Sequence, residues 1–165
     1  MKKRFLLISL IVMGVIFVTG CDKKQIPKTP DDSIKINADQ ISFYVPDVFK
    51  VNQDNIEHQK YEYYYRQKGD EASVLVTIID AKDYNNSPAE FIKYYMGAED
   101  KDIKKETING HEWTTASRET EIGLYLYSTV IGDQMYMVRI RINEKGDIAI
   151  KSLDYIKDTL YIYDK

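Results

Sequence analysis

The chain has a single cysteine, Cys21, and its position limits how the rest of the protein can fold. Lys2, Lys3 and Arg4 form a positive start, and an almost purely apolar run over residues 5–18 follows them. Small residues then lead up to the cysteine. A run of about fourteen apolar residues is short against the roughly twenty that span a bilayer. The N-terminal segment therefore has the layout of a cleaved export signal, and the domain behind it has no disulfide available.

The four residues that end this segment, Val18-Thr19-Gly20-Cys21, resemble the lipobox of a bacterial lipoprotein signal peptide. The resemblance implies that the thiol receives a diacylglyceryl group and that cleavage leaves the cysteine as the first mature residue. Two or three acyl chains, palmitate among them, would hold the domain on the extracytoplasmic side of the cell membrane, because each buried methylene contributes about 0.8 kcal/mol. An uncleaved membrane anchor and a plain secretory signal with a coincidental cysteine are the alternatives.

Three regions are predicted along the chain: the signal peptide at residues 1–20, the lipidated cysteine with a flexible linker at 21–33, and one folded domain at 34–165. The linker is rich in lysine, aspartate and proline, and such a stretch buries too little apolar surface to order itself. About 130 residues suffice for one hydrophobic core. Loss of the signal peptide removes three positive charges and moves the formal net charge from −3 to −6. An acidic domain is a poor candidate for binding nucleic acid.

The folded region alternates strand-like and helix-like patterns. Strands are expected where β-branched and aromatic residues cluster, over residues 41–45, 61–66, 72–79, 103–108, 111–118, 122–131 and 135–142. The dipeptide Asn109-Gly110 favours a tight hairpin turn, and Gly132-Asp133 marks another.

Two helices are expected among these strands. Ser87-Pro88-Ala89-Glu90 has the residues of a capping box with proline at the first helical position, and Gly97 ends that helix. A second helix is expected over residues 147–160. Its predicted buried residues are Leu153, Ile156 and Leu160.

The order of these elements resembles the PsbP-like family of small α/β proteins, whose other branch is a Ran-binding import factor. The resemblance covers roughly residues 38–163 and is carried by the strand 41–46, the helix start at 87–91, the hairpin 108–113 and the helix 147–160. It implies an α+β fold, in which an antiparallel β-sheet is packed with helices as a PsbP-like α/β sandwich in a single domain. It also implies a binding or assembly accessory role, and it supplies no shared catalytic residues.

The sequence shows no recognisable catalytic or metal-binding pattern. His58 and His111, the only histidines, fall in different elements and outside any zinc-ligand motif, and His111 is expected to be an exposed turn residue. Asp100-Lys101-Asp102 lacks the glycine and the distal glutamate of a calcium loop. Nucleophile-elbow, phosphate-loop and dinucleotide motifs are missing. We therefore expect neither an enzyme nor a metal or cofactor site.

Tyrosine is unusually abundant, with fourteen residues in the chain. Tyr61, Tyr63 and Tyr65 alternate along one expected strand, and Tyr125 and Tyr127 along another, so each set shares a face. The opposite face of the second strand is apolar and is expected under the helices, which would leave the tyrosine face half covered. Such tyrosines either cover the second side of a small sandwich or form a partner surface.

Arg139 and Arg141 also alternate, in the last expected strand, and should point together from its outer face. They would meet a carboxylate or a phosphate, or pair with nearby acidic residues. The candidate partner surface combines both kinds of residue: Tyr63, Tyr65, Tyr125, Tyr127, Arg139 and Arg141.

Three functions follow from this reading of the sequence. The first is a membrane-anchored, extracytoplasmic module that binds or helps assemble a protein partner. The second is an envelope protein that captures a small molecule or glycan. An enzyme is the third, and it has no nucleophile, metal or acid pair to support it.

Replacement of the cysteine tests the anchor. A Cys21→Ser precursor has no thiol to lipidate, so we expect the domain to leave the membrane fraction or to stall as an unprocessed precursor. Cell fractionation and the mass of the product provide the measurement. A Cys21→Ser protein that is membrane-bound, correctly cleaved and acylated would contradict the lipobox interpretation.

Overall fold

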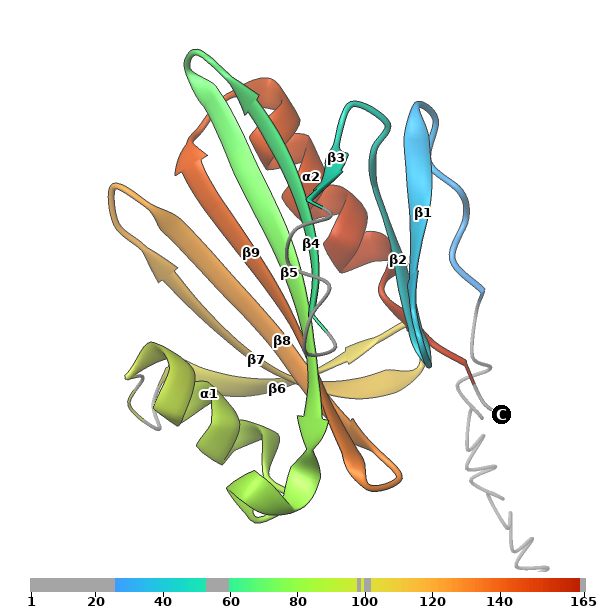
Figure 1. The fold of residues 1–165 in the computed structure, drawn as a ribbon, viewed down its shortest axis with the longest axis vertical. Helices are drawn as coiled ribbons and strands as arrows, with labels where there is room; N and C mark the ends of the chain where they lie inside the picture. The colour runs from blue at the N-terminus through green and yellow to red at the C-terminus, as the bar shows by residue number, and fades with distance from the viewer. Residues whose placement is uncertain (1–25, 53–59, 98, 100–101, 164–165) are drawn as a thin grey trace, which may run out of the picture.

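The structure is a computed structural model that describes residues 26–52, 60–97, 99 and 102–163. The predicted signal peptide, Cys21, the first part of the predicted linker and His58 lie outside these residues. The described part of the chain has two antiparallel sheets, two α-helices and one short 3-10 helix, η2 (Ala81–Tyr84) (Figure 1). The predicted α+β class, an antiparallel sheet packed with helices, is confirmed. Within the described ranges, neither α-helix is long and apolar enough to cross a membrane.

The larger sheet has seven strands in the order β3-β4-β5-β9-β8-β7-β6. Its strands are β3 (Lys50–Asn52), β4 (Lys60–Gln67), β5 (Asp70–Asp80), β6 (Ile103–Ile108), β7 (His111–Glu119), β8 (Gly123–Ile131) and β9 (Gln134–Glu144). The two longest strands, β5 and β9, pair along the centre of the sheet. The sequence pattern predicted every strand of this sheet except the short β3.

A smaller sheet has the order β1-β2-β10. Its strands are β1 (Ser33–Ala38), β2 (Ile41–Pro46) and β10 (Tyr161–Ile162). Only β2 was predicted, because β1 follows a proline-rich stretch and β10 has two residues. Both flank β2, so the two ends of the described chain lie on either side of one strand.

The last residues of the predicted linker contact the domain. Thr29 Oγ1 lies 3.1 Å from the hydroxyl of Tyr44, and the Tyr155 hydroxyl donates to the carbonyl of Asp31 at 2.7 Å. These bonds fix the point at which the chain enters the smaller sheet.

The first helix, α1 (Pro88–Met96), begins and ends where the sequence predicted. Ser87 Oγ accepts a hydrogen bond from the backbone N–H of Glu90 at 3.3 Å, as a capping residue does. Gly97 ends the helix with φ 60°, a left-handed conformation that costs little without a Cβ. The buried residues of α1 are Phe91, Ile92 and Met96.

The second helix, α2 (Asp147–Thr159), packs against β2 and β5. Ile156 and Leu160 are fully buried, as predicted. Leu153 is only partly buried at the edge of this core, so its predicted burial is correct only in part.

The N-terminus of α2 is capped from the β4–β5 turn. Gly146, at the N-cap, provides no side chain, and Asp70 instead accepts from Ile148 N at 2.9 Å and from Ala149 N at 2.8 Å. The carboxylate satisfies N–H groups that have no partner within the helix and lies at the positive end of the helix dipole. A Cβ on Gly146 would clash with the Asp70 side chain, so this position requires glycine.

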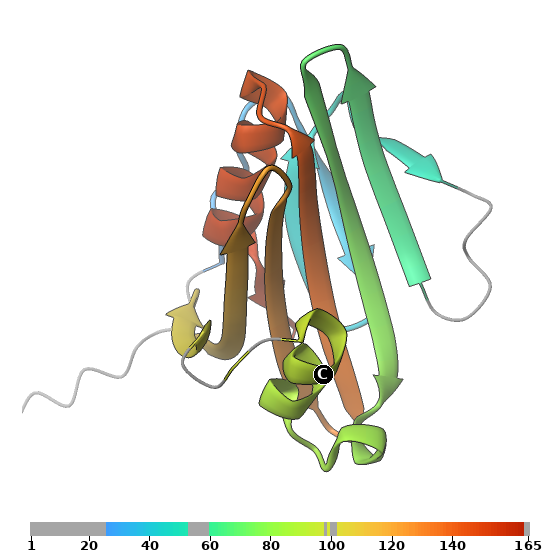
Figure 2. The ribbon, with the colours of Figure 1, turned by 90° about the vertical axis from the view of Figure 1, so that its left-hand side faces the viewer.

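The larger sheet has a hydrophobic core on each face. One face packs against α2 and the smaller sheet and includes Trp113 and Ile140. The other face packs against α1, where Phe91 meets Leu126 and Met137. Figures 1 and 2 show α1 near one end of the strands and α2 nearer the other.

His111 is a buried residue, so the prediction that it is an exposed turn residue is wrong. Its ring meets the ring of Tyr161 edge-on, with 5.2 Å between the ring centres. Tyr161 belongs to β10, the short strand that the sequence did not predict, and it covers the histidine.

The cap on α2 has a measurable effect on stability. Asp70→Ala leaves two helix N–H groups without their acceptor, and we expect the free energy of unfolding to fall by about 1–2 kcal/mol. Lys68→Ala, an exposed change in the same turn, should alter it by less than about 0.5 kcal/mol. Urea unfolding of both variants checks this, and equal stabilities would show that the cap is not important.

Candidate functional site

The structure divides the candidate partner surface between the two faces of the larger sheet. Four of its residues lie on the face toward α2 and the smaller sheet: Tyr63, Tyr65, Tyr125 and Tyr127. The other two line a hollow on the opposite face: Arg139 and Arg141. The six residues therefore do not form one surface. The register explains this, since the tyrosines of β8 pair with Val138 and Ile140, whose side chains point into the core.

Tyr127 is a core residue, 6% exposed, and comparable with Leu126 at 0% on the other face of the same strand. Burial raises the pKa of Tyr127 to about 12, and the nearby Glu106 carboxylate adds to this effect. The prediction of a half-covered tyrosine face is wrong at this position because β8 is covered on both faces.

Tyr125 is partly buried beside a hollow between α2 and strands β6 to β8. Its hydroxyl donates to Glu119 Oε1 at 3.3 Å. Burial raises the pKa of Tyr125 most, and the Glu119 carboxylate raises it further. The hollow has a volume of about 460 Å³, and carboxylates and lysines both line it. This mixture of charges favours no single class of ligand.

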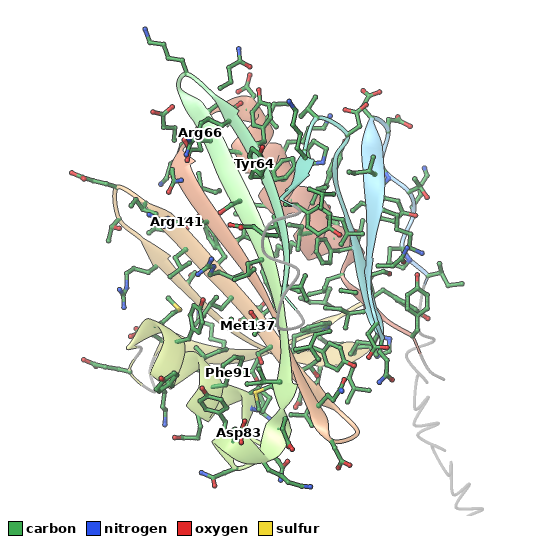
Figure 3. The ribbon with its side chains drawn as sticks, in the orientation of Figure 1. Tyr64, Arg66, Asp83, Phe91, Met137 and Arg141 are labelled. Carbon is green, nitrogen blue, oxygen red and sulfur yellow. The ribbon has the colours of Figure 1, made fainter. Side chains whose placement is uncertain are left out.

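The face that carries α1 is covered over only part of its length. α1 has nine residues and β9 has eleven. At about 1.5 Å per helical residue and about 3.4 Å per strand residue, the helix is roughly 14 Å long and the strand roughly 37 Å. Figure 3 shows Phe91 near Met137 toward one end of the strands, and Arg141 and Tyr64 farther along the strands.

Beyond α1, five strands bring one row of side chains to this face. The backbone register aligns residues of β7, β8, β9, β5 and β4 in the order Arg118, Leu124, Arg141, Ser73 and Tyr64. Adjacent strands are about 4.8 Å apart, so the row is roughly 19 Å long. We call this row, together with three neighbouring side chains, the arginine face: Tyr64, Ser73, Tyr95, Arg118, Ile122, Leu124, Arg139 and Arg141.

Two hollows adjoin on the arginine face and share Arg141. One has a volume of about 430 Å³ and extends toward Tyr64 and Asn143. The other, of about 380 Å³, is lined by Tyr95, Arg118, Thr120, Ile122, Leu124, Arg139 and Arg141. This second hollow has three arginines and no carboxylate among the described residues that line it.

Two of these arginines are held by the end of α1. Arg118 Nη2 donates to the carbonyl of Met96 at 2.7 Å, which satisfies an unpaired acceptor at the helix C-terminus. Arg139 Nη1 donates to the hydroxyl of Tyr95 at 2.8 Å. A guanidinium has five N–H donors, so each arginine keeps several for another partner.

Arg141 is exposed and donates no side-chain hydrogen bond to the residues that the structure describes. Near it, Arg66 forms a two-pronged pair with Glu71, at 2.9 and 3.1 Å. The pKa of Glu71 is lowered by the hydrogen bonds from Arg66 and Asn143, and Arg141 adds a smaller electrostatic effect.

Every arginine that follows the predicted signal peptide lines one of these two hollows. The sequence predicted that Arg139 and Arg141 share a face, and this is confirmed. It did not predict Arg118 or Tyr95, because their places depend on strand pairing and on the end of α1. The sequence does show that arginine is rare, with only four residues after the predicted signal peptide, and this rarity was the signal that could have drawn attention to Arg118.

No protein-family model matches the chain, and no curated protein matches it. Among solved structures, the chain is similar to a crystal structure from Bacteroides thetaiotaomicron VPI-5482, with a TM-score of 0.49 and 13% identity over 81% of this chain and 49% of that one. It is also similar to the solution structure of cyanobacterial PsbP (CyanoP) from Synechocystis sp. PCC 6803, with a TM-score of 0.48 and 14% identity over 79% of this chain and 91% of that one. The chain thus spans about half the length of the Bacteroides protein.

Alkaline titration tests the burial of the core tyrosines. The pKa values of Tyr127 and Tyr136 are raised to about 12, mainly by burial, and for Tyr136 also by its hydrogen bond to Asp39. Because folding favours the neutral phenols, their contribution to stability is complete below about pH 10 and is lost as the pH rises through about 12.

We expect Tyr127→Phe to lose less stability than the wild-type protein over this pH window, by roughly 1–3 kcal/mol. The measurement is urea unfolding at the two ends of the window. Tyr94→Phe, a change at an exposed side chain, should lose as much stability as the wild-type protein. A Tyr127→Phe curve that runs parallel to the wild-type curve would show that this hydroxyl is not desolvated.

Proposed function

We propose that this protein is a membrane-anchored extracytoplasmic lipoprotein whose domain binds a protein partner through the arginine face. One observation carries the proposal: where α1 ends, the larger sheet presents arginine, tyrosine and aliphatic side chains in one row across five strands. Tyrosine and arginine contribute most to affinity at protein interfaces, especially beside apolar groups that exclude water.

The anchor supports this proposal through the length of chain that it allows. Thr29 is the first residue with a described hydrogen bond to the domain, and it lies eight positions after Cys21 along the chain. A fully extended chain spans at most about 3.5 Å per residue, so lipid on the cysteine would keep this contact within roughly 30 Å of the membrane surface. A partner is then met close to the membrane rather than in free solution.

The chemistry of the arginine face favours binding over catalysis. Its side chains are guanidinium, phenol, hydroxyl and aliphatic groups. Arginine and tyrosine ordinarily keep one protonation state near neutral pH, so they recognise charge and shape but are poor general acids and bases. Accessory binding is therefore the role that we assign to the domain.

Capture of a small molecule is the second candidate function. The hollow of about 380 Å³ falls in the size range of ligand pockets, and it combines Leu124 and Tyr95 with three arginines. An amphipathic anion fits this lining. The row of side chains continues beyond the hollow to Tyr64, however, and a partner with a broad contact surface uses more of the face.

Site-specific crosslinking in intact cells tests the proposed function. A photoreactive amino acid is placed at Tyr64 or Ile122, which are 40% and 39% exposed on the arginine face. Ile150 is 47% exposed on α2, on the other side of the sheet, and serves as the matched control. We expect both positions of the arginine face to yield the same discrete protein adduct, and Ile150 to yield none.

Two other outcomes would contradict the proposal. If Ile150 gives the same adduct as Tyr64 and Ile122, contact is not specific to the arginine face. If neither position of the arginine face gives a protein adduct while a low-molecular-mass compound copurifies with the domain, the capture of a small molecule is the better account.

A further inference from the structure

We infer that the arginine face recognises an extended acidic segment of the partner, with carboxylates spaced to reach Arg118 and Arg141. This inference rests on the proposed function and adds the chemistry and spacing of the segment that is bound. Four observations support it: the distribution of charge, the choice of arginine over lysine, the environment of Arg139, and the dimensions of the row.

The charge of the domain is separated in space. The chain behind the predicted signal peptide has a formal net charge of −6, yet its arginines all line the two hollows of one face. The hollow beside α1 has no carboxylate in its described lining to neutralise them. The hollow toward Tyr64 does have two carboxylates in its lining, Glu62 and Glu71, and Glu71 pairs with Arg66. An acidic segment is therefore attracted most strongly to the hollow beside α1.

The use of arginine points to carboxylates in particular. Lysine is much more common than arginine in the chain, but the three cations that line the hollow beside α1 are all arginine. A guanidinium forms two parallel hydrogen bonds with a carboxylate, whereas an ammonium group acts as a point charge. Tyr95 and Met96 hold two of the guanidiniums in place, which lowers the entropic cost of binding.

Arg139 is the most enclosed of the three arginines. Its Nε is buried and hydrogen bonds to no described group, while Nη1 is bound to Tyr95. Leu75 and Leu126 are its cross-strand neighbours, so its surroundings are largely apolar. A cation in such a setting gains more from a carboxylate than an exposed cation does, because water screens the pair less.

The dimensions of the row favour a peptide over a small anion. Arg118 and Arg141 are two strands apart, which is about 10 Å between their backbones. A peptide in the extended polyproline II conformation has three residues per turn and rises about 3.1 Å per residue, so carboxylates at positions i and i+3 lie on the same side with about this separation. The whole row of roughly 19 Å matches about six extended residues, with Leu124 between the two arginines to contact an apolar side chain.

Peptide pools of defined pattern test the inference. The first is a fluorescein-labelled pool of nine-residue peptides with glutamate at positions 3 and 6 and all other positions randomised. A second pool has glutamine at positions 3 and 6, and a third has adjacent glutamates at positions 3 and 4. Fluorescence polarisation measures binding to the full mature lipoprotein in detergent micelles. We expect the first pool to bind at least about tenfold more tightly than the second, and more tightly than the third.

Matched variants locate the binding. Arg118→Gln/Arg141→Gln should weaken binding of the first pool by about tenfold or more. Arg141→Gln alone should give part of this loss, and it removes no described hydrogen bond. Lys151→Gln/Lys157→Gln makes the same change in charge on α2 and should bind like the wild-type protein. Urea unfolding establishes that each variant is folded.

Several results would overturn the inference. These are an absence of binding by the wild-type protein, equal binding of the glutamate and glutamine pools, or unchanged binding by folded Arg118→Gln/Arg141→Gln. If millimolar octanoate displaces the peptides, and Arg118→Gln/Arg141→Gln weakens octanoate binding as much as peptide binding, the arginines are assigned to a small carboxylate instead. If crosslinks from Tyr64 and Ile122 persist in the double variant, the proposed binding of a protein partner is retained, and only the inference that the bound segment is acidic is wrong.

Discussion

The burial of β9 on both faces is the constraint on which the rest of the structure depends. Its side chains at even positions, from Tyr136 to Ile142, form the core under α2 and the smaller sheet. At odd positions Met135 and Met137 belong to the second core, in which α1 packs mainly against β8 and β7, and each contributes roughly 1.5–3 kcal/mol through burial. The next two odd positions of β9 are arginines, so on this face the strand passes from the core beneath α1 to charged side chains.

The end of α1 also determines which part of this face of the sheet is left uncovered. Gly97 ends the helix in a left-handed conformation, and Arg118 binds the carbonyl of Met96 just before it. The nine residues of α1 cover the methionines of β9 but leave Arg141 exposed. The binding that we propose uses the part of the sheet that the helix leaves uncovered.

Local signals explain which parts of this architecture the sequence predicted. The helix cap at Ser87, the Asn-Gly turn and the alternation of Arg139 with Arg141 each depend on residues close together in the chain, and each is confirmed. The second half of the expected capping box does not form, because the Ser87 N–H donates to the carbonyl of Tyr84 and the Glu90 carboxylate pairs with Lys93. The features that the sequence did not predict depend on contacts between residues far apart in the chain. Strand β10 exists through its pairing with β2, and Asp70 caps a helix that begins 77 residues later. Tyr127 was misplaced because alternation shows which residues share a face but not what covers it.

The two faces of the larger sheet therefore differ. The side chains of β8 and β9 that point toward α2 contribute to stability through burial, and those beyond α1 are the ones to which we assign the proposed binding. Because neighbouring residues such as Ile140 and Arg141 point in opposite directions, a change at one need not disturb the contacts of the other. Arg118 and Arg139 are the exception, since they also bind the end of α1. Arg141 has no such second role among the described residues, and it is therefore the position at which binding separates most cleanly from folding.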